Sequence, residues 1–193
     1  MYKVVIFDFF GVFCSPLATD WFKASVPDYE PKMQEFEALC TESDYGRLTR
    51  AALIDEFSKL SGVPPQKISD DIEAGVRINT ALVDYANQLK TKGYRVACLS
   101  NGNHEWTQRV IDEQGLGHVF EQVIMSSDLG MVKPNRDIYE RCLDMLGVNA
   151  GDAIFVDDRQ VNVTGAEACG IRSLLFTDTP AFITEFESLQ SAQ

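Results

Sequence analysis

The chain contains few of the residues that zinc sites and disulfide frameworks need. It has only two histidines, and its five cysteines are odd in number, scattered along the chain and never spaced as a CxxC pair. Such frameworks require tighter ligand spacings, so we expect the cysteines to be reduced thiols. No apolar run reaches the length of a membrane span, and the first residues lack the charge and apolar stretch of a secretory signal. These absences predict a cytoplasmic protein with no membrane partner.

Basic residues are also scarce. The chain has 17 lysines and arginines against 29 aspartates and glutamates among its 193 residues, which gives a formal net charge of −12. Such a surface repels the phosphate backbone of nucleic acids, so no nucleic-acid partner is expected. An anionic substrate would have to find positive charge inside a pocket. With 45% hydrophobic residues, the chain can build the core of one domain, or a core with a modest insertion.

Short apolar runs with the length of buried strands recur along the chain. Helical periodicity follows two of them, over about residues 103–114 and in the segment that ends at Gly147. Strand and helix in alternation predict an α/β fold, in which helices cover both faces of a parallel sheet. The five predicted strands cover residues 3–8, 94–100, 122–125, 153–157 and 171–176.

The interval between the first two predicted strands does not fit this alternation of strand and helix. More than eighty residues separate the first two strands, far more than a single crossover needs. Pro31 and Pro65 suit the first turns of helices there. We expect residues 14–79 to form a helical insertion over the carboxyl end of the first strand, with residues 1–13 and 80–193 as the α/β core. Helical patterns fill the interval over about residues 31–40, 49–60, 65–76 and 80–90.

Polar residues stand where four of the predicted strands end. Carboxyl ends of parallel strands meet at one edge of a sheet, where open α/β proteins bind their ligands. Each residue alone is more typical of a turn, a helix cap or a surface charge. Their shared location instead indicates the parts of one mechanism. They are Asp8 after the first strand, Ser100, Asn101 and Gly102 after the second, Lys133 after the third, and Asp157 and Asp158 after the fourth.

This set of residues suits phosphoryl transfer assisted by magnesium. Asp8 can attack a phosphoryl group and form an aspartyl-phosphate. Three neighbouring carboxylates need a cation, and Mg²⁺ accepts one or two carboxylates together with waters and phosphate oxygens. The Lys133 ammonium, the Ser100 hydroxyl and backbone N–H groups around Asn101 and Gly102 can bind the phosphoryl oxygens.

The four segments resemble, in order and interval, the four motifs of the haloacid dehalogenase superfamily. The resemblance runs from Asp8 to about Gly165, and the DDxxxN sequence that begins at Asp157 is similar to that of the phosphatase-like branch. It implies a Rossmann-like core with a small helical cap of the C1 type. It also implies Asp8 as nucleophile and Mg²⁺ as cofactor, with the Phe10 backbone carbonyl as a metal ligand. Asn162 is expected to support the metal site by contacting the metal ligands rather than the metal itself.

The first motif, DFFGV, departs from the family pattern. Most phosphatases of this superfamily carry a second Asp two residues after the nucleophile, where it acts as general acid and base. Here that position is Phe10, which can do neither. Loss of such a group removes on the order of 10²–10⁴ in rate. Efficient turnover at this site therefore requires compensation from another group or from the substrate.

Three functions remain open from the sequence. The preferred one is a slow or specialised phosphatase for a small phosphorylated metabolite, because some relatives with a DxGxV motif lack the second Asp. The second is a 2-haloacid dehalogenase, whose relatives carry an aromatic residue at this position and need no metal. Those relatives lack the tandem Asp pair, however, and place an arginine early in the cap. The third is a non-catalytic module that binds a metal and a phosphorylated ligand. The oligomeric state and the substrate are not encoded in any motif.

The expected cap contains one loop with candidate specificity residues. Asp44, Tyr45 and Arg47 flank Gly46 just before a predicted helix. In the family, loops of this kind can reach over the active site and select the leaving group. Arg159, which follows the Asp pair, is instead expected to be a surface charge.

Overall fold

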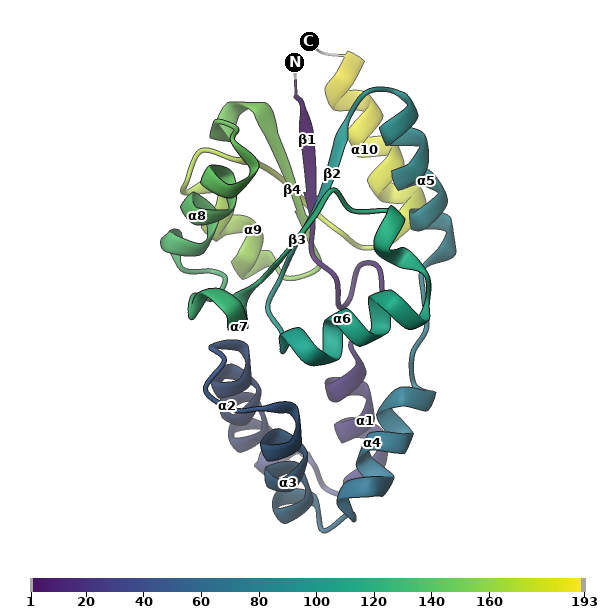
Figure 1. Cartoon of the computed structure of the whole chain (residues 1–193), viewed down its shortest axis with the longest axis vertical. Helices are drawn as coiled ribbons and strands as arrows, with labels where there is room; N and C mark the ends of the chain where they lie inside the picture. The colour runs from purple at the N-terminus through teal and green to yellow at the C-terminus, as the bar shows by residue number, and fades with distance from the viewer. Residues whose placement is uncertain (1, 192–193) are drawn as a thin grey trace.

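The computed structural model describes residues 2–191 and contains a wholly parallel five-stranded sheet (Figure 1). The strand order is β3-β2-β1-β4-β5, so the chain starts in the middle of the sheet, builds one half and then crosses back to build the other. The predicted α/β fold is confirmed, and each predicted strand matches within one residue at either end. The strands are β1 (Val4–Phe7), β2 (Arg95–Ser100), β3 (Gln122–Met125), β4 (Ala153–Asp157) and β5 (Arg172–Leu175).

Helices cover both faces of this sheet, as Figure 1 shows. Successive β1 side chains alternate between the faces: Val5 and Phe7 belong to the core under α5 and α10, whereas Val4 and Ile6 pack with α8 and α9. Because both faces are buried, β1 appears in the sequence as an unbroken apolar run. The helices of this core are α5 (Thr80–Thr91), α6 (His104–Glu113), α7 (Ser126–Leu129), α8 (Arg136–Leu146), α9 (Gln160–Glu167) and α10 (Thr179–Ser191), with 3₁₀ turns at Leu116–His118 and Ala150–Asp152.

A second group of helices lies beyond the carboxyl ends of the strands (Figure 1). We call it the helical cap. Its core is aromatic: the Phe36 ring stacks on Phe22 at 4.2 Å and on Phe57 at 4.9 Å between ring centroids. The first cap helix was not predicted, because it follows Pro16 without a side-chain cap and is only nine residues long. The cap helices are α1 (Leu17–Ser25), α2 (Met33–Asp44), α3 (Arg50–Ser61) and α4 (Pro65–Ala74), with a 3₁₀ turn at Glu30–Lys32.

Two segments that run side by side connect the cap to the core. The Ser15 N–H donates to the Arg77 carbonyl at 3.0 Å, and the Asn79 N–H donates to the Phe13 carbonyl at 2.9 Å. Asn79 also caps α5 by accepting a hydrogen bond from the Leu82 N–H. The chain therefore leaves the core and returns to it at one place.

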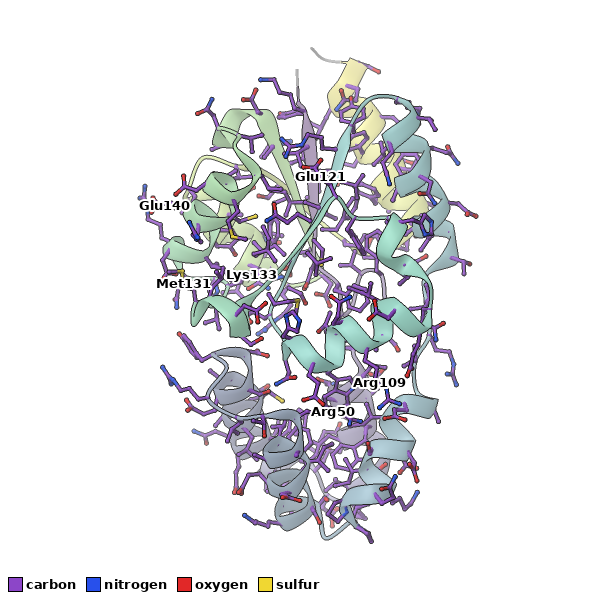
Figure 2. The ribbon with its side chains drawn as sticks, viewed as in Figure 1. Arg50, Arg109, Glu121, Met131, Lys133 and Glu140 are labelled. Atoms are coloured by element: carbon purple, nitrogen blue, oxygen red, sulfur yellow. The ribbon has the colours of Figure 1, made fainter. Side chains whose placement is uncertain are left out.

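The cap also contacts the core at its far ends. The Ser126 hydroxyl donates to the Asp44 carbonyl at 2.7 Å, which ties the end of α2 to the start of α7. On the other side, Arg50 of α3 and Arg109 of α6 both bind the Glu73 carboxylate at 2.7 Å. Figure 2 shows the two arginines close together at this boundary. The cap is thus held against the carboxyl edge of the sheet. Within residues 2–191, the helices are too short or too polar for any of them to traverse a bilayer.

Gly46 provides a test of how the cap contacts the core. Its φ is +74°, and a Cβ there would lie 2.4 Å from the Ser127 carbonyl oxygen. We expect Gly46→Ala to destabilise the protein by about 1–3 kcal/mol more than Gly62→Ala, because only the first substitution adds a clash to the backbone strain. Gly62 is a matched control, since its φ is +76° and open space surrounds it. Urea unfolding of both variants measures the difference, and equal losses would contradict the close contact.

Candidate active site

The predicted site residues of the core lie together at the carboxyl edge of the sheet. Asp8 follows β1, Ser100 ends β2 and Asp157 ends β4. Because β1 lies between β2 and β4, these three positions are neighbours. Lys133 reaches them from the loop between α7 and α8 (Figure 2). The sheet order therefore brings together residues that are far apart in the sequence.

The Lys133 ammonium is the centre of this cluster. Its Nζ lies 2.7 Å from Asp157 Oδ2 and 3.0 Å from Asp8 Oδ1, and it donates to the Leu99 carbonyl at 2.9 Å. These three contacts use all of its N–H groups. The Lys133 side chain is fully buried. The positive charge that an anionic substrate needs is therefore held inside the protein, under an acidic surface.

The acidic side chains around Lys133 differ in their titration. Burial would lower the pKa of Lys133, but Asp8 and Asp157 raise it to about 12. Burial would raise the pKa of Asp157, yet Lys133 and hydrogen bonds from Arg159 and Asn162 hold it below its usual range. Burial raises the pKa of Asp8 in spite of Lys133, and Asp157 and Asp158 add to the rise. Asp8 could act as a nucleophile only when ionised, and a bound cation would lower its pKa and favour that state.

The donor set of the site fits Mg²⁺. Carboxylate oxygens of Asp8, Asp157 and Asp158 all lie within 4.8 Å of one another. A Cβ at Gly11, where φ is +88°, would lie 2.1 Å from Asp158 Oδ2, so only glycine leaves room for this carboxylate. No backbone N–H among residues 2–191 donates to the Phe10 carbonyl, and that oxygen is thus available as a ligand. Oxygen donors alone suit Mg²⁺ rather than zinc.

Asn162, expected to support a metal site, contacts one member of this donor set. Its amide Nδ2 donates to both Asp157 oxygens, at 2.9 and 3.1 Å, while the Tyr139 hydroxyl donates to its backbone carbonyl. Its Oδ1 atom is buried and has no hydrogen-bond partner within residues 2–191. An unpartnered buried oxygen beside three carboxylates is consistent with a bound cation and its water shell.

The predicted phosphate-binding segment of the core is only partly available to a ligand. Ser100 is buried beside Asp8, with its hydroxyl 3.4 Å from the Asn101 carbonyl. The Asn101 side chain makes two hydrogen bonds to the Lys133 backbone. Its Oδ1 accepts from the Lys133 N–H and its Nδ2 donates to the Lys133 carbonyl, both at 2.9 Å. The Gly102 N–H donates to the Ser126 hydroxyl at 3.1 Å. The Gly102 N–H thus has a partner within the protein in this structure, and its role in binding an anion stays a prediction.

A cavity of about 560 Å³ lies between this cluster and the cap. Asp8, Phe10 and Asp158 line it from the core, and Phe10 packs over Gly102, where a Cβ would lie 3.4 Å from its ring. The position that is usually acidic thus presents an aromatic ring to the cavity. The cap segment contributes a wall that is partly apolar and partly polar. Its lining residues are Pro16, Leu17, Ala18, Thr19, Phe36, Glu37, Cys40, Thr41, Ser43, Asp44 and Leu53.

The three predicted specificity residues of the cap differ in position. Asp44 lines the cavity. The Arg47 side chain is 58% exposed, pairs with Glu42 at 2.8 Å and stacks over the Tyr45 ring. Arg47 therefore points away from the cavity, and the Tyr45 hydroxyl accepts a hydrogen bond from Asn135 of the core. A role of this loop in substrate selection stays a prediction, and Asp44 is the residue placed to contact a substrate.

Among the cavity residues that the sequence did not identify are two from the core, Arg159 and Trp106. Arg159, expected as a surface charge, is exposed but also lines the cavity. Trp106 of α6 is buried and lines it too. In the sequence, a tryptophan six residues after a strand end cannot be told apart from an ordinary core residue. His104, by contrast, lies on the surface, where its Nδ1 contacts Asp128 Oδ2 at 2.7 Å.

Comparisons with known proteins agree with this geometry. Fold and site define an α/β protein with a cluster of charged residues at the carboxyl edge of a parallel sheet, next to a helical cap. The model of the haloacid dehalogenase-like hydrolase family matches residues 2–170. The chain belongs to this family of hydrolases.

Individual relatives differ in activity. The chain is 30% identical over 135 residues to (S)-2-haloacid dehalogenase 4A of Burkholderia cepacia, covering 68% of this chain and 58% of that protein. It is 29% identical over 107 residues to phosphoglycolate phosphatase 1 of Pseudomonas aeruginosa, covering 55% of this chain and 39% of that protein. The matches thus span less than two thirds of either relative.

A solved structure shows the same fold. It is a haloacid dehalogenase family enzyme of Bacteroides thetaiotaomicron in complex with magnesium and inorganic phosphate. The TM-score is 0.75 at 21% identity, and the match covers 92% of this chain and 95% of that one. At this identity the likeness concerns the fold.

The buried ion pairs of Lys133 predict a large effect of its removal. In Lys133→Met, Asp8 and Asp157 lose their shared counter-charge inside the protein. We expect the free energy of unfolding in EDTA to fall by about 3–5 kcal/mol, measured by urea denaturation at neutral pH. Lys23→Met, at an exposed position of α1, is the control. A loss as small as that of the control would show that the carboxylates do not depend on Lys133.

Asp44 predicts a pH-dependent effect on stability. Burial raises its pKa to about 7, although Lys133 and Arg159 act to lower it. The folded chain therefore binds more protons than the unfolded chain between about pH 4 and pH 7, and stability is lost as the pH rises through this window. Asp44→Asn removes this loss. We expect the Tm of the variant to exceed that of the wild type at pH 8, by about 2–4 °C per kcal/mol relieved, and to match it near pH 4.

The control for this measurement is Glu35→Gln, an exposed carboxyl on the same helix. Its Tm difference from the wild type should not change between the two pH values. A constant difference for Asp44→Asn as well would mean that Asp44 is ionised at no cost in the folded protein.

Proposed function

We propose that the chain is a magnesium-dependent phosphatase that acts on a small phosphorylated metabolite through an aspartyl-phosphate on Asp8. The observation that carries the proposal is the cluster of three carboxylates around one buried lysine, beside a cavity of about 560 Å³. Three acids with one fixed counter-charge suit a site completed by a divalent cation and a phosphoryl dianion. A phosphatase among the relatives, and a family structure with magnesium and phosphate, support the same reading.

The geometry suits nucleophilic attack by Asp8. Its Oδ1 atom is held by the Lys133 ammonium and by the Phe9 N–H, which leaves Oδ2 free to attack phosphorus. Asp8, Asp157, Asp158 and the Phe10 carbonyl would hold Mg²⁺, which when bound neutralises charge on the phosphoryl oxygens. The Ser100 hydroxyl is the remaining neutral donor beside the nucleophile. Positioning and charge neutralisation are most of what phosphoryl transfer requires.

The cap suits the exclusion of water during this reaction. We treat residues 14–79 as a cap domain that closes over the site, since both of its connections to the core lie side by side and its far ends bind α6 and α7. The cavity of about 560 Å³ accommodates a small metabolite rather than a polymer. A closed, dry site strengthens the electrostatic interactions that hold the phosphoryl group.

A 2-haloacid dehalogenase is the second candidate. The Phe10 ring in the cavity favours it, as does the 30% identity to a dehalogenase. Displacement of halide by Asp8 would need no proton from residue 10. The tandem pair Asp157 and Asp158 speaks against it, because a halide and a carboxylate substrate gain nothing from two further negative charges.

Phosphate release tests the proposal. The purified protein is assayed on p-nitrophenyl phosphate and on a panel of phosphorylated sugars, nucleotides and small acids, with Mg²⁺ and with EDTA. We expect release that depends on Mg²⁺ and is abolished in Asp8→Asn, because the nucleophile and a metal ligand are lost together. Asp20→Asn, at an exposed position of α1, is the matched control and should keep the wild-type rate.

A second assay separates the two candidates. Chloride release from 2-chloropropionate is measured with Mg²⁺ and with EDTA. Release that is insensitive to EDTA, together with no phosphate release from any compound, would reject the phosphatase and favour the dehalogenase. No release of either ion would leave a binding module as the function.

A further inference from the structure

The Phe10 ring leaves the proposed phosphatase without a proton-transfer group at the usual position, so another group of the cavity would have to transfer the proton. Four acidic side chains line the cavity: Asp8, Asp158, Glu37 and Asp44. Asp8 acts as the nucleophile, and Asp158 belongs to the metal cluster. Glu37 is exposed at the rim of the cavity. Asp44 is the acid that remains.

The position of Asp44 is fixed by the core rather than by the cap alone. Its backbone carbonyl accepts a hydrogen bond from the Ser126 hydroxyl at 2.7 Å, and the same hydroxyl accepts from the Gly102 N–H at 3.1 Å. Two residues further on, Gly46 lies so close to Ser127 that a side chain would not fit. Asp44 is thus linked through one serine to the segment that holds Lys133 in place.

The Asp44 side chain has no competing partner in the protein. Among residues 2–191, its carboxyl forms no ion pair and makes no hydrogen bond, although it lines the same cavity as Asp8. The neighbouring Ser43 is 2% exposed and also lines the cavity, and its hydroxyl has no partner within the described residues. Buried polar groups are normally paired, so this end of the cavity is built for a polar ligand.

We propose that Asp44 is the general acid and base of the reaction, supplied by the cap in place of the acid that residue 10 lacks. The proposal rests on the proposed phosphatase function. It places the leaving oxygen of the substrate between the phosphoryl site at Asp8 and the cap carboxyl, with the Ser43 hydroxyl beside it.

The two chemical steps balance with this assignment. Asp8 Oδ2 forms a bond to phosphorus while the bond from phosphorus to the leaving oxygen breaks. The electron pair stays on that oxygen, which takes the proton of the Asp44 carboxyl and departs as an alcohol. Water then attacks the phosphorus of the aspartyl-phosphate and gives its proton to the Asp44 carboxylate. The bond from phosphorus to Asp8 breaks, and phosphate leaves, so both aspartates return to their starting states.

The electrostatic surroundings of Asp44 are compatible with both roles. Burial raises its pKa to about 7, while Lys133 and Arg159 act to lower it. The other charged side chains that face the cavity are Glu37, Asp8 and Asp158. A general acid and base works best when its pKa lies near the operating pH, because both protonation states are then accessible. The usual carboxyl of an exposed Asp would be ionised and unable to donate.

Substrates with different leaving groups test the proposal. p-Nitrophenolate is a stable anion that departs without a proton, whereas phenolate leaves slowly unless it is protonated. We expect Asp44→Asn to lower kcat/KM for phenyl phosphate about 10²–10⁴-fold and to lower it far less for p-nitrophenyl phosphate. Since the second step also loses its base, p-nitrophenol should appear as a burst of one equivalent, with the aspartyl-phosphate accumulating.

Glu37→Gln is the matched comparison, because it removes the other cap carboxylate of the same cavity. It should change kcat/KM for the two substrates by the same factor and give no burst. The thermal unfolding of both variants is measured first, so that loss of fold is recognised.

The outcomes separate this proposal from the proposed function. Equal losses on both substrates and no burst in Asp44→Asn would overturn the role of Asp44 and leave the phosphatase intact. Leaving-group dependence in Glu37→Gln instead would assign the role to Glu37. A wild-type protein that releases no phosphate from these two compounds or from any member of the metabolite panel would reject the phosphatase and this proposal together.

Discussion

The burial of the Lys133 ammonium constrains the rest of the structure. An unpaired ammonium inside a protein costs several kcal/mol, so this residue requires all three of its partners at once. Those partners belong to three strands: Asp8 follows β1, Asp157 ends β4 and the Leu99 carbonyl lies in β2. Only an order that places β2, β1 and β4 side by side satisfies them. The pairing of Lys133 and the order of the strands therefore depend on each other. The cluster also has more negative than positive charge, which a bound cation would offset.

The parts of the molecule that follow from local chemistry could be predicted from the sequence. The strands are continuous apolar runs because both faces of the sheet are buried, and the residues at their ends meet because parallel strands share an edge. The family motifs then identified Asp8, Lys133 and the Asp pair together. Roles in catalysis and metal binding remain predictions, since geometry shows proximity and not turnover.

Features that depend on tertiary contacts could not be predicted. The Gly102 N–H appeared to be a free donor, but Ser126, from a segment 24 residues away, accepts its hydrogen bond. No sequence pattern around Gly102 or Ser126 predicts this hydrogen bond. Arg47 was one of three candidate specificity residues of the cap loop, yet Glu42 and the Tyr45 ring hold it at the surface. Asp44 differs from other acids at helix ends because it lines the cavity between cap and core, where desolvation raises its pKa to about 7.

Under the proposed role of Asp44, its location on the cap would link proton transfer to the contact between cap and core. A general acid on the core is present whether or not the cap covers the site, whereas one on the cap arrives only when the end of α2 contacts Ser126. Closure that expels water also removes solvent from the Asp44 carboxyl, and this desolvation is the largest cause of its raised pKa. An open cap would return Asp44 to water, ionised and unable to donate. Phe10 fits this arrangement, because an apolar ring beside the nucleophile keeps the site dry without a second charge.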